Sequence, residues 1–560
     1  MTKFRWTITP PVPRDRMARF RGIPPSTAQI SYNRGLTDLS QIKKFLSIED
    51  LPLPDPNLLP DIAPAIERIT AAIERRELIA VYGDFDADGV TATALLNNGL
   101  TALGARTTPY IPHRTEEGHG LSVQGLEKFG GLGVDLIITA DCGVSSRSEI
   151  ELANEMGIDV IVTDHHTPPP DLPPALAIID PKRRDSPYPF RELAAVGLAY
   201  RTMQVLRHHL GHDEDESLLD LVALGSVADM APLVGDNRNL VKRGLEVLNR
   251  AERPGLRELM SRAGVSPGNL DAETISFSLA PRINAAGRVD HAITSYRLLT
   301  AASAAEAQPL ADELNQRNRQ RRSHTEDAFA RAQAQLDEPP VDGPIIIAGG
   351  PGFEPGVVGL VAGKLSEERY RPAVVLSTGP EVTRASCRSI PEFDITAALQ
   401  QCADLFIRHG GHAQAAGFVI ANENIDALKD RLTKIAAERL GDLDLQPSIK
   451  IDVAMPLTQI EARLLKFIRL LEPVGQGNPR PVFLSKRLTP LGVRTMGSDE
   501  AHLRMSLRGG TSVWNAVAFR MGHRIGELTG PIDAVYHIKI DRWQDRERLE
   551  LELIDFAPSA

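Results

Sequence analysis

Short apolar runs that each end in an acidic residue recur in one part of the chain. Three of them are Leu78–Gly83, Asp135–Ala140 and Ile158–Thr163, and each contains Ile or Val. Runs of this length and composition are typical of strands buried on both faces of a parallel sheet. The segments between them, Gly89–Leu103 and Ser145–Met156, have the pattern of helices. The sequence therefore predicts a β-α-β-α-β unit.

The rest of the chain changes pattern several times. We expect five parts: a basic N-terminal extension at 1–45, a first α/β domain at 46–270, a connecting region at 271–340, a second α/β domain at 341–445 and a small β-barrel at 446–560. Pro309–Leu336 is predicted as one long helix, because a proline stands at its start and two more follow its end. The barrel is indicated by short alternating strands around a helix at Leu457–Leu470. The N-terminal extension is expected to be loosely packed, with an arm that contacts a polyanion as the alternative.

Carboxylates and imidazoles stand where the predicted strands end. The residues concerned are Asp84, Asp86, Asp88, Asp141, Asp164, His165, His166 and, after a later apolar helix, Asp229. The carboxyl ends of parallel strands lie along one edge of a sheet, so these groups are expected to meet there. Taken singly, each is equally well a cap, a turn residue or a solvated acid. Taken together they would repel one another, and a pair of divalent cations is the simplest compensation.

A calcium-binding loop is a weaker interpretation of the first acidic cluster. The spacing of Asp84, Asp86 and Asp88 before Gly89 is similar to such a loop. That motif needs a Glu six residues after the glycine, and Leu95 stands there. Mg²⁺ or Mn²⁺ is therefore the better prediction, since both prefer oxygen ligands and Mn²⁺ also accepts imidazole.

Four sequence words carry a resemblance to the DHH superfamily of phosphoesterases. They are D-F-D-A-D-G-V at 84–90, D-C-G-V at 141–144, D-H-H at 164–166 and G-S-V-A-D-M at 225–230. From about residue 45 onward the chain resembles the RecJ family of bacterial single-strand-specific 5′→3′ DNA exonucleases. Further family-like words are P-R-I-N-A-A-G-R at 281–288, G-G-H-A-Q-A-A-G at 410–417 and E-P-V-G-Q-G-N-P at 472–479. Cys387 departs from the family pattern, which has Gly there.

The resemblance implies a fold and a metal site. The fold would be a Rossmann-like parallel-sheet DHH phosphoesterase domain, a long connecting helix, an α/β DHHA1 domain and a C-terminal OB-type β-barrel. Asp84 and Asp86 would hold the first of two Mn²⁺ or Mg²⁺ ions, and Asp88, His165 and Asp229 the second, with Asp141 bridging both. His166 would face the phosphate as a charge stabiliser or acid, and Asp164 would orient an imidazole. Asp141, His165 and His166 are the implied catalytic residues.

Basic residues supply candidate contacts to a nucleic-acid strand. Arg114 follows the predicted strand Thr107–Ile111, where it is either solvated or in contact with a phosphate. Between Arg282 and Arg322 there are seven arginines against four acids, so the region is locally basic. The arginines of the long helix form either a solvated face or the wall of a channel for the strand. The resemblance implies that Ser386, Arg388 and His412 face the metal edge, and we expect Arg288 and Arg388 to bind a terminal 5′-phosphate. Arg114 and Arg319 are the further candidate substrate contacts.

Composition adds little to these expectations and contradicts none of them. The 560 residues are 42% hydrophobic and 24% charged, with a net charge of −10, to which a cluster of metal-binding acids would contribute. We expect no membrane span, because no apolar run approaches about 20 residues. Three cysteines far apart and the lack of an export signal favour the cytoplasm. Trp514, Phe519 and Trp543 are either base-stacking or core residues of the barrel.

The function implied by the resemblance is metal-dependent hydrolysis of single-stranded DNA from its 5′ end, releasing 5′-mononucleotides in DNA repair and recombination. Implied partners are single-stranded DNA, a RecQ-like helicase and a single-strand-binding protein, and we expect a monomer. One alternative is a DHH phosphodiesterase of short oligonucleotides or dinucleotides, which would lack the barrel at 446–560. Another is a non-catalytic, Cdc45-like replication scaffold, which would have lost metal ligands.

Overall fold

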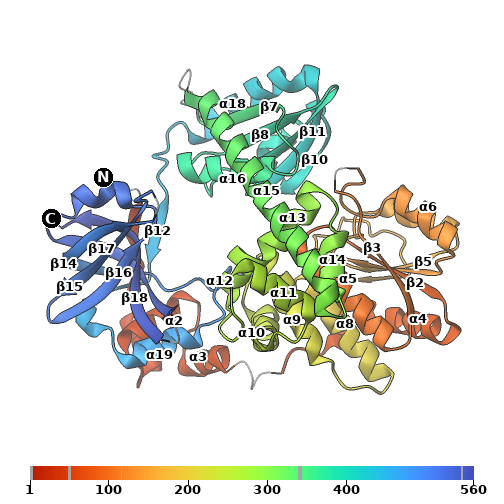
Figure 1. Ribbon diagram of the computed structural model, residues 1–560, viewed down its shortest axis with the longest axis horizontal. Coiled ribbons are helices and arrows are strands. Elements are labelled where there is room, and N and C mark those ends of the chain that lie inside the picture. The colour runs from red at the N-terminus through yellow and green to blue at the C-terminus, as the bar shows by residue number, and fades with distance from the viewer. Residues whose placement is uncertain are drawn as a thin grey trace. The chain divides into compact units, whose positions relative to one another are not determined.

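The computed structural model describes residues 4–47, 52–114, 116–337, 343–497, 499–543 and 546–559, with the side chains of 540–548 excepted. The chain divides into two compact units (Figure 1). The large unit is Leu53–Leu445, and the barrel unit combines Met1–Pro52 with Gln446–Ala560. Among the helices in the described ranges, none has the length and apolar character needed to cross a membrane.

A five-stranded, all-parallel sheet forms the first half of the large unit, in the order β3-β2-β4-β5-β6. The strands are β2 (Leu78–Gly83), β3 (Arg106–Tyr110), β4 (Leu136–Ala140), β5 (Asp159–Thr163) and β6 (Ala177–Ile179). Every residue of β4 is buried, as expected for a strand covered on both faces. The structure confirms the Rossmann-like sheet that the apolar runs predict.

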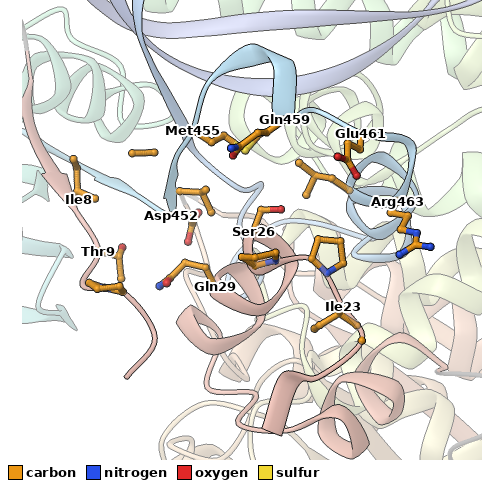
Figure 2. Close-up of a pocket in the computed structure, with 17 residues that line it drawn as sticks. Ile8, Thr9, Ile23, Ser26, Gln29, Asp452, Met455, Gln459, Glu461 and Arg463 are labelled. Carbon is orange, nitrogen blue, oxygen red and sulfur yellow. The ribbon is translucent and has the colours of Figure 1, made fainter. Parts of the chain in front are cut away.

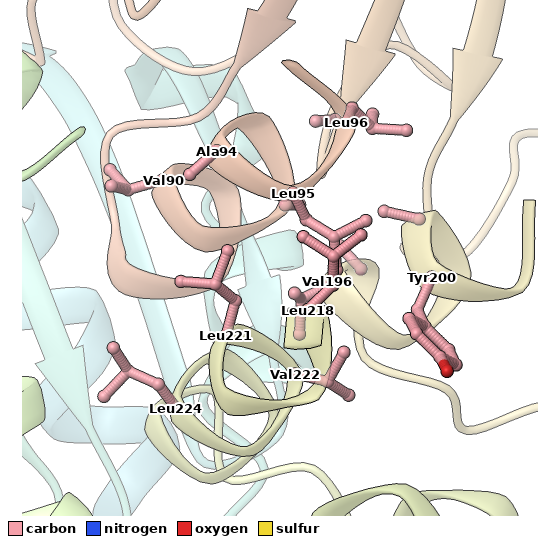
Figure 3. Close-up of a cluster of buried hydrophobic side chains, with 14 of the residues drawn as sticks. Val90, Ala94, Leu95, Leu96, Val196, Tyr200, Leu218, Leu221, Val222 and Leu224 are labelled. Atoms are coloured by element: carbon pink, nitrogen blue, oxygen red, sulfur yellow. The ribbon is translucent and has the colours of Figure 1, made fainter. Parts of the chain in front are cut away.

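Helices cover both faces of this sheet because alternate strand residues point to opposite sides. Ile79 and Val81 belong to the core under α4 (Ile62–Arg75), α5 (Ala87–Ala102), α8 (Ala195–His209) and α9 (Leu219–Ala228). Ala80 and Tyr82 belong to a separate core under α6 (Val123–Leu132) and α7 (Arg147–Glu155). The first core closes where side chains such as Leu95, Val196 and Leu221 meet between α5, α8 and α9 (Figure 3).

A group of helices follows and leads to the second half of the large unit. They are α10 (Gly235–Arg250), α11 (Pro254–Ala263), α12 (Ala272–Thr274), a π-helical turn (Ile275–Leu279), α13 (Ala280–Val289), α14 (Ile293–Thr300) and α15 (Ala304–Asp337). The predicted long helix is confirmed as α15, which begins before Pro309. Its Ala311 and Leu314 are buried in the first core, and its Ala332 is buried in the core of the next domain. One helix therefore packs into both halves.

The second half of the large unit is a mixed sheet in the order β10-β11-β9-β8-β7. Its strands are β7 (Ile346–Pro351), β8 (Ala373–Thr378), β9 (Val382–Arg388), β10 (Phe406–His412) and β11 (Ala415–Ala421). Helix α16 (Val358–Arg369) shares one core with α15, and α17 (Ile395–Gln400) and α18 (Ile425–Leu440) share another. Cys387 is buried with α17 and α18, while Ser386 and Arg388 alternate toward α16.

The barrel unit confirms the predicted small barrel. Its strands are β12 (Ser448–Ile451), β13 (Val453–Ala454), β14 (Phe483–Met496), β15 (His502–Gly509), β16 (Ser512–Ala518), β17 (Ile532–Trp543) and β18 (Arg546–Pro558). The order β14-β15-β16-β18-β17 closes through pairing of β14 with β17. Helix α19 (Ala462–Leu470) is shorter than predicted, because a separate 3₁₀ turn occupies Leu457–Gln459.

The N-terminal residues are part of the barrel unit, and the expectation of a loosely packed extension was wrong for residues 4–47. Strand β1 (Arg5–Ile8) pairs with β12, and the helices are α1 (Arg14–Met17), α2 (Pro25–Asn33) and α3 (Leu39–Leu46). Phe20 and Ile30 are buried in the same core as Phe467. Burial of these apolar side chains stabilises the segment. A cavity of about 780 Å³ lies between this segment and residues 452–464 (Figure 2).

The three candidate base-stacking residues of the barrel have different surroundings. Trp514 packs, partly buried, against the barrel core. Phe519 is 45% exposed and contacts the ring of His502 edge-on. The side chain of Trp543 lies outside the described residues. The predicted domain boundaries stay predictions.

Candidate metal centre

Three adjacent strands of the parallel sheet bring the predicted acids together. Asp84 follows β2, Asp141 follows β4 and His165 stands two residues after β5. Asp229 reaches the same edge from the end of α9 and is exposed. Three groups have potential ligand atoms within 4.8 Å of one another: Asp84, Asp86 and Asp141; Asp88, His165 and Asp229; and Asp141, His165 and His166. The arrangement is thus a cluster in which Asp141 and His165 each take part twice.

The loop after β2 is held in place by hydrogen bonds to the first turn of α5. Asp86 caps α5 by accepting hydrogen bonds from the backbone N–H groups of Asp88 (3.0 Å) and Gly89 (3.1 Å). A Cβ at Gly89 would lie 2.7 Å from backbone atoms of Asp84, so only glycine lets the helix start this close to the strand end. The sequence word D-x-D-x-D-G therefore sets the separation of the first three carboxylates.

Asp88 is held by the backbone of a second helix. Its carboxylate accepts hydrogen bonds from the N–H groups of Ala195 (2.8 Å) and Val196 (2.9 Å) at the start of α8. The side chain is 1% exposed, and burial raises its pKa even though His165 opposes the shift. The helix start stabilises the negative charge and aims the carboxylate at the cluster.

Asp141 is a buried acid of the cluster whose charge is poorly compensated. It adopts a left-handed backbone conformation (φ 68°) and is 4% exposed. Its Oδ1 lies 3.1 Å from Nε2 of His165 but forms no hydrogen bond with any of the described residues. Burial, together with Asp86, Asp88 and Asp84, raises its pKa well above the usual range. Oδ1 of Asp84 also lacks a hydrogen-bond partner. Buried carboxylate oxygens without donors fit divalent cations.

The two histidines are oriented differently. Nδ1 of His165 lies 3.0 Å from the carbonyl oxygen of Leu193, which can only accept, so Nδ1 carries a proton and Nε2 faces the carboxylates, where it can serve as a metal ligand. Nδ1 of His166 lies 2.8 Å from Oδ1 of Asp164. That hydrogen bond raises the pKa of His166 to about 9. His165 is therefore set up as a metal ligand and His166 as a cation.

Asp164 is the acid that orients His166. Its carboxylate also accepts hydrogen bonds from the backbone N–H groups of Val144 (2.9 Å) and His165 (2.7 Å). Burial acts to raise its pKa, but the His166 hydrogen bond and charge lower it overall. Asp164 thus remains ionised beneath the histidine pair.

Three arginines gather beside the acids. The guanidinium of Arg114 lies 4.8 Å from the ring centre of Phe85. Arg288 on α13 donates to the carbonyl oxygen of Gly356 (3.3 Å), and Arg388 donates to that of Cys387 (2.8 Å). Burial lowers the pKa of Arg288, and the neighbouring positive charges of Arg114, Arg321 and Arg388 lower it further. This concentration of positive charge would accommodate an anion.

A cavity of about 520 Å³ separates the two halves of the large unit at this point. Arg114 and His119 line it on one side and Ser386 on the other. Arginines that the sequence did not single out, Arg384 and Arg408, also line it. The cavity is a recess between the metal edge and the mixed sheet, with basic side chains among apolar lining residues.

Two predicted contact residues, Arg319 and His412, are exposed. Arg319 is exposed on α15, and its neighbour Arg321 is the residue that lies near Arg288. His412, at the end of β10, is exposed and does not line the cavity. Their roles, like those of the other predicted site residues, stay predictions.

The motif at 281–288 supports the first acidic loop. The spacing of its residues in the sequence did not reveal this role. Oδ1 of Asn284 accepts a hydrogen bond from the N–H of Ala87 (2.8 Å). A Cβ at Gly287 would lie 2.7 Å from the carbonyl oxygen of Phe85. Helix α13 therefore packs directly on the loop that carries Asp84 and Asp86. A glycine inside a helix was the available signal for such a close approach.

Replacing Gly287 by Ala is expected to destabilise the large unit by about 1–3 kcal/mol, because the new methyl group displaces the backbone of Phe85. Urea unfolding measures the loss of stability. Gly131→Ala in α6 is the control, since no described atom outside its own stretch of helix lies within 4 Å of a Cβ there. Equal stability of the two variants would contradict the proposed close packing.

Comparisons with known proteins agree with this architecture. Residues 78–226 match the DHH family, N-terminal domain, residues 342–438 match the DHHA1 domain and residues 451–555 match the RecJ OB domain. A parallel sheet with an acid and histidine edge, followed by a DHHA1 domain, defines a DHH-type protein.

The chain belongs to the RecJ family. It is 36% identical to the single-stranded-DNA-specific exonuclease RecJ of Bacillus subtilis, over 100% of this chain and 71% of that protein. It is 32% identical to RecJ of Escherichia coli, over 95% of each chain. The crystal structure of RecJ from Thermus thermophilus in complex with Mn²⁺ matches with a TM-score of 0.85 at 31% identity, covering 100% of this chain and 80% of that one.

Proposed function

We propose that the chain is a metal-dependent exonuclease that hydrolyses single-stranded DNA from its 5′ end and releases 5′-mononucleotides. The observation that carries the proposal is the cluster of acids and histidines, with Asp141 shared between groups, beside three arginines. The relatives named single-stranded-DNA-specific exonucleases support the substrate and the reaction. The Thermus thermophilus structures in complex with Mn²⁺ and with Mg²⁺ support the cofactors.

The ligand groups suggest how two cations would be held. Asp84 and Asp86 would bind the first Mn²⁺ or Mg²⁺ ion. Asp88, His165 and Asp229 would bind the second. Asp141 would bridge them, which suits its unpaired Oδ1. When bound, such a pair clamps a phosphodiester, supplies a nucleophile at neutral pH and stabilises the leaving oxygen.

The histidine and arginine side chains would act on the strand itself. His166, kept protonated by Asp164, would stabilise charge on the scissile phosphate or donate a proton to the leaving O3′. Arg288 and Arg388 would hold the terminal 5′-phosphate, since one guanidinium group can donate two parallel hydrogen bonds to phosphate oxygens. Ser386 would add a hydrogen bond. We assign contacts with other phosphates to Arg114, Arg319 and His412.

The barrel unit bears on the choice between functions. A closed OB-type barrel provides a surface for a long single strand, so we favour a DNA exonuclease over a dinucleotide phosphodiesterase. The full set of acids and histidines disfavours a non-catalytic scaffold. Within this proposal the protein is a cytoplasmic monomer in DNA repair and recombination. Its partners would be a RecQ-like helicase and a single-strand-binding protein.

A pair of labelled oligonucleotides tests the proposed polarity. Both are single-stranded and carry a 5′-phosphate, one with a 3′ label and one with a 5′ label, in the presence of Mn²⁺. We expect a ladder of shortening products from the first and immediate release of labelled mononucleotide from the second. Immediate mononucleotide release from the 3′-labelled strand would instead show digestion from the 3′ end. Cleavage of dinucleotides alone would favour the phosphodiesterase alternative.

Binding of Mn²⁺ is expected to raise the Tm of the protein. A ligand that binds only the folded state at 100 times its Kd stabilises that state by about 2.7 kcal/mol. Differential scanning fluorimetry with and without a chelator would measure the shift, which should amount to several degrees. Asp229→Asn should reduce it, because Asp229 is an exposed member of the ligand cluster. An identical shift in this variant would remove Asp229 from the site.

A further inference from the structure

The loop between β3 and α6 brings two cationic or titratable side chains to the metal edge. Arg114 lies against Phe85, and Nδ1 of His119 lies 3.2 Å from Oδ2 of Asp84. The ring centres of His119 and Phe85 are 4.4 Å apart. Both side chains therefore depend on the path of this loop, whose described residues form no strand or helix.

Glu117 gathers both ends of the loop onto one carboxylate. Its Oε2 accepts hydrogen bonds from the hydroxyl of Tyr110 (2.8 Å) on β3 and from that of Ser122 (2.5 Å) at the start of α6. Its Oε1 accepts one from the backbone N–H of His113 (2.7 Å), next to Arg114. Three donors converge on an acceptor that is half buried. The carboxylate thus closes the loop across its base.

The partners of Glu117 are themselves fixed. Ser122 caps α6 by accepting from the N–H of Gly125 (3.0 Å), and it is buried. The buried hydroxyl of Tyr82 on β2 donates to the carbonyl oxygen of Gly120 (3.0 Å). Burial raises the pKa of Tyr110, so its hydroxyl stays a donor. The Glu117 carboxylate is therefore anchored to the same sheet that carries the metal cluster.

We propose that Glu117 is a positioning residue for Arg114: its carboxylate holds the loop so that the guanidinium stays beside Phe85, ready for a substrate phosphate. This inference rests on the proposed function, in which Arg114 contacts the strand. The hydrogen bonds described for the Glu117 carboxylate all go to Tyr110, His113 and Ser122, and it belongs to none of the ligand groups. It therefore acts through the loop and not on the reacting atoms.

The two accepting oxygens of the Glu117 carboxylate hold the loop, and the volume of the side chain matters less. A carboxylate accepts at both oxygens, whereas the amide of Gln has only one accepting atom and presents N–H groups to the remaining donors. Glu117→Gln keeps the shape and leaves at least one donor without its acceptor. Glu116, the exposed neighbour in the same loop, offers a matched control in Glu116→Gln.

Kinetics on a 5′-phosphorylated single strand test whether Glu117 acts through Arg114. Arg114→Gln is expected to raise KM about tenfold, since it removes a charge-assisted phosphate contact. Glu117→Gln should raise KM about three- to tenfold with a smaller change in kcat, and Glu116→Gln should leave both unchanged. The double variant should be no worse than Arg114→Gln alone, because both changes remove the same contact. Losses that multiply in the double variant would overturn the positioning role.

The rate of trypsin cleavage after Arg114, in the presence of Mn²⁺, measures how well the loop is held in place, independently of enzyme activity. Arg114 is half buried, and we expect about tenfold faster cleavage there in Glu117→Gln but not in Glu116→Gln. An unchanged rate would overturn the inference. If the rate rises while Arg114→Gln keeps the wild-type KM, the positioning role stands and the proposed phosphate contact of Arg114 fails. The two proposals are thereby separated.

Discussion

Asp141→Asn is expected to lower the rate of DNA cleavage roughly a thousandfold while the fold stays intact. Asp141 takes part in two of the three ligand groups and has an oxygen without a donor, so its loss affects both proposed cation positions. Asparagine tolerates the left-handed backbone at this position, which keeps the loop in place. Single-turnover cleavage of a labelled strand at saturating Mn²⁺ measures the effect. Activity near the wild-type level would contradict the metal site.

The same variant should be more stable than the wild type when metal is chelated. Burial and the charges of Asp86, Asp88 and Asp84 raise the pKa of Asp141 in the folded state. A raised carboxyl pKa means that the folded state binds more protons than the unfolded state, so stability falls as pH rises above about 4. Urea unfolding with a chelator at pH 5 and pH 8 should show a smaller decrease in Asp141→Asn. An equal decrease would contradict the charge repulsion.

Asp159→Asn is the matched control for both measurements. Asp159 is an acid of the same sheet, but it lies at the amino end of β5, where it pairs with Arg68 (2.6 Å). Its replacement should leave cleavage unchanged and cost about 1 kcal/mol, because the Asp159 side chain is about half exposed and Arg68 keeps its pairing with Glu77. A large loss of activity in this control would mean that the Asp141 result reports general damage to the sheet.

The second large effect is expected at the 5′ end of the substrate. Arg388→Gln should lower kcat/KM about a hundredfold on a 5′-phosphorylated strand and much less on a strand with a 5′-hydroxyl. The reason is that Arg388 lies among guanidinium groups whose positive charge a terminal phosphate would offset. Comparison of the two strands isolates the end contact from general strand binding.

Arg431→Gln provides the control for this substitution. Arg431 lies on α18, which covers the other face of the mixed sheet, and it pairs with Asp404. Its replacement should leave kcat/KM unchanged on both the phosphorylated and the hydroxyl strand. Equal losses on the phosphorylated and the hydroxyl strands in Arg388→Gln would show that Arg388 does not read the terminal phosphate.

The acids of the metal edge could be predicted because a buried strand and its end leave clear marks in sequence. The runs ending before Asp84, Asp141 and Asp164 match β2, β4 and β5 closely. Parallel pairing then requires their carboxyl ends to meet. The same logic could not place Arg319 and Arg321, because the sequence does not show which face of their helix packs against protein and which faces solvent. In the structure Arg321 is the one near Arg288.

Other features escaped prediction because they depend on pairs of residues far apart in sequence. Asn284 and Gly287 were visible only as part of a family word, and their contacts with Ala87 and Phe85 appear only in three dimensions. Glu117 resembled any loop acid until its three donors were placed. The strand β10 was missed because Gly410 and Gly411 lie within it, and glycine is rare in strands.

The barrel unit has a consequence for the order in which the protein can fold on the ribosome. Phe20 and Ile30 are made early, but their core includes Phe556, which is made long after them. At about 5–20 residues per second, roughly 25–100 s separate the two. The large unit ends at Leu445, so its chain is complete before the barrel strands exist. The nascent chain would therefore contain the complete large unit before its barrel can form. During that interval the apolar side chains of the first helices would be exposed and available to chaperones.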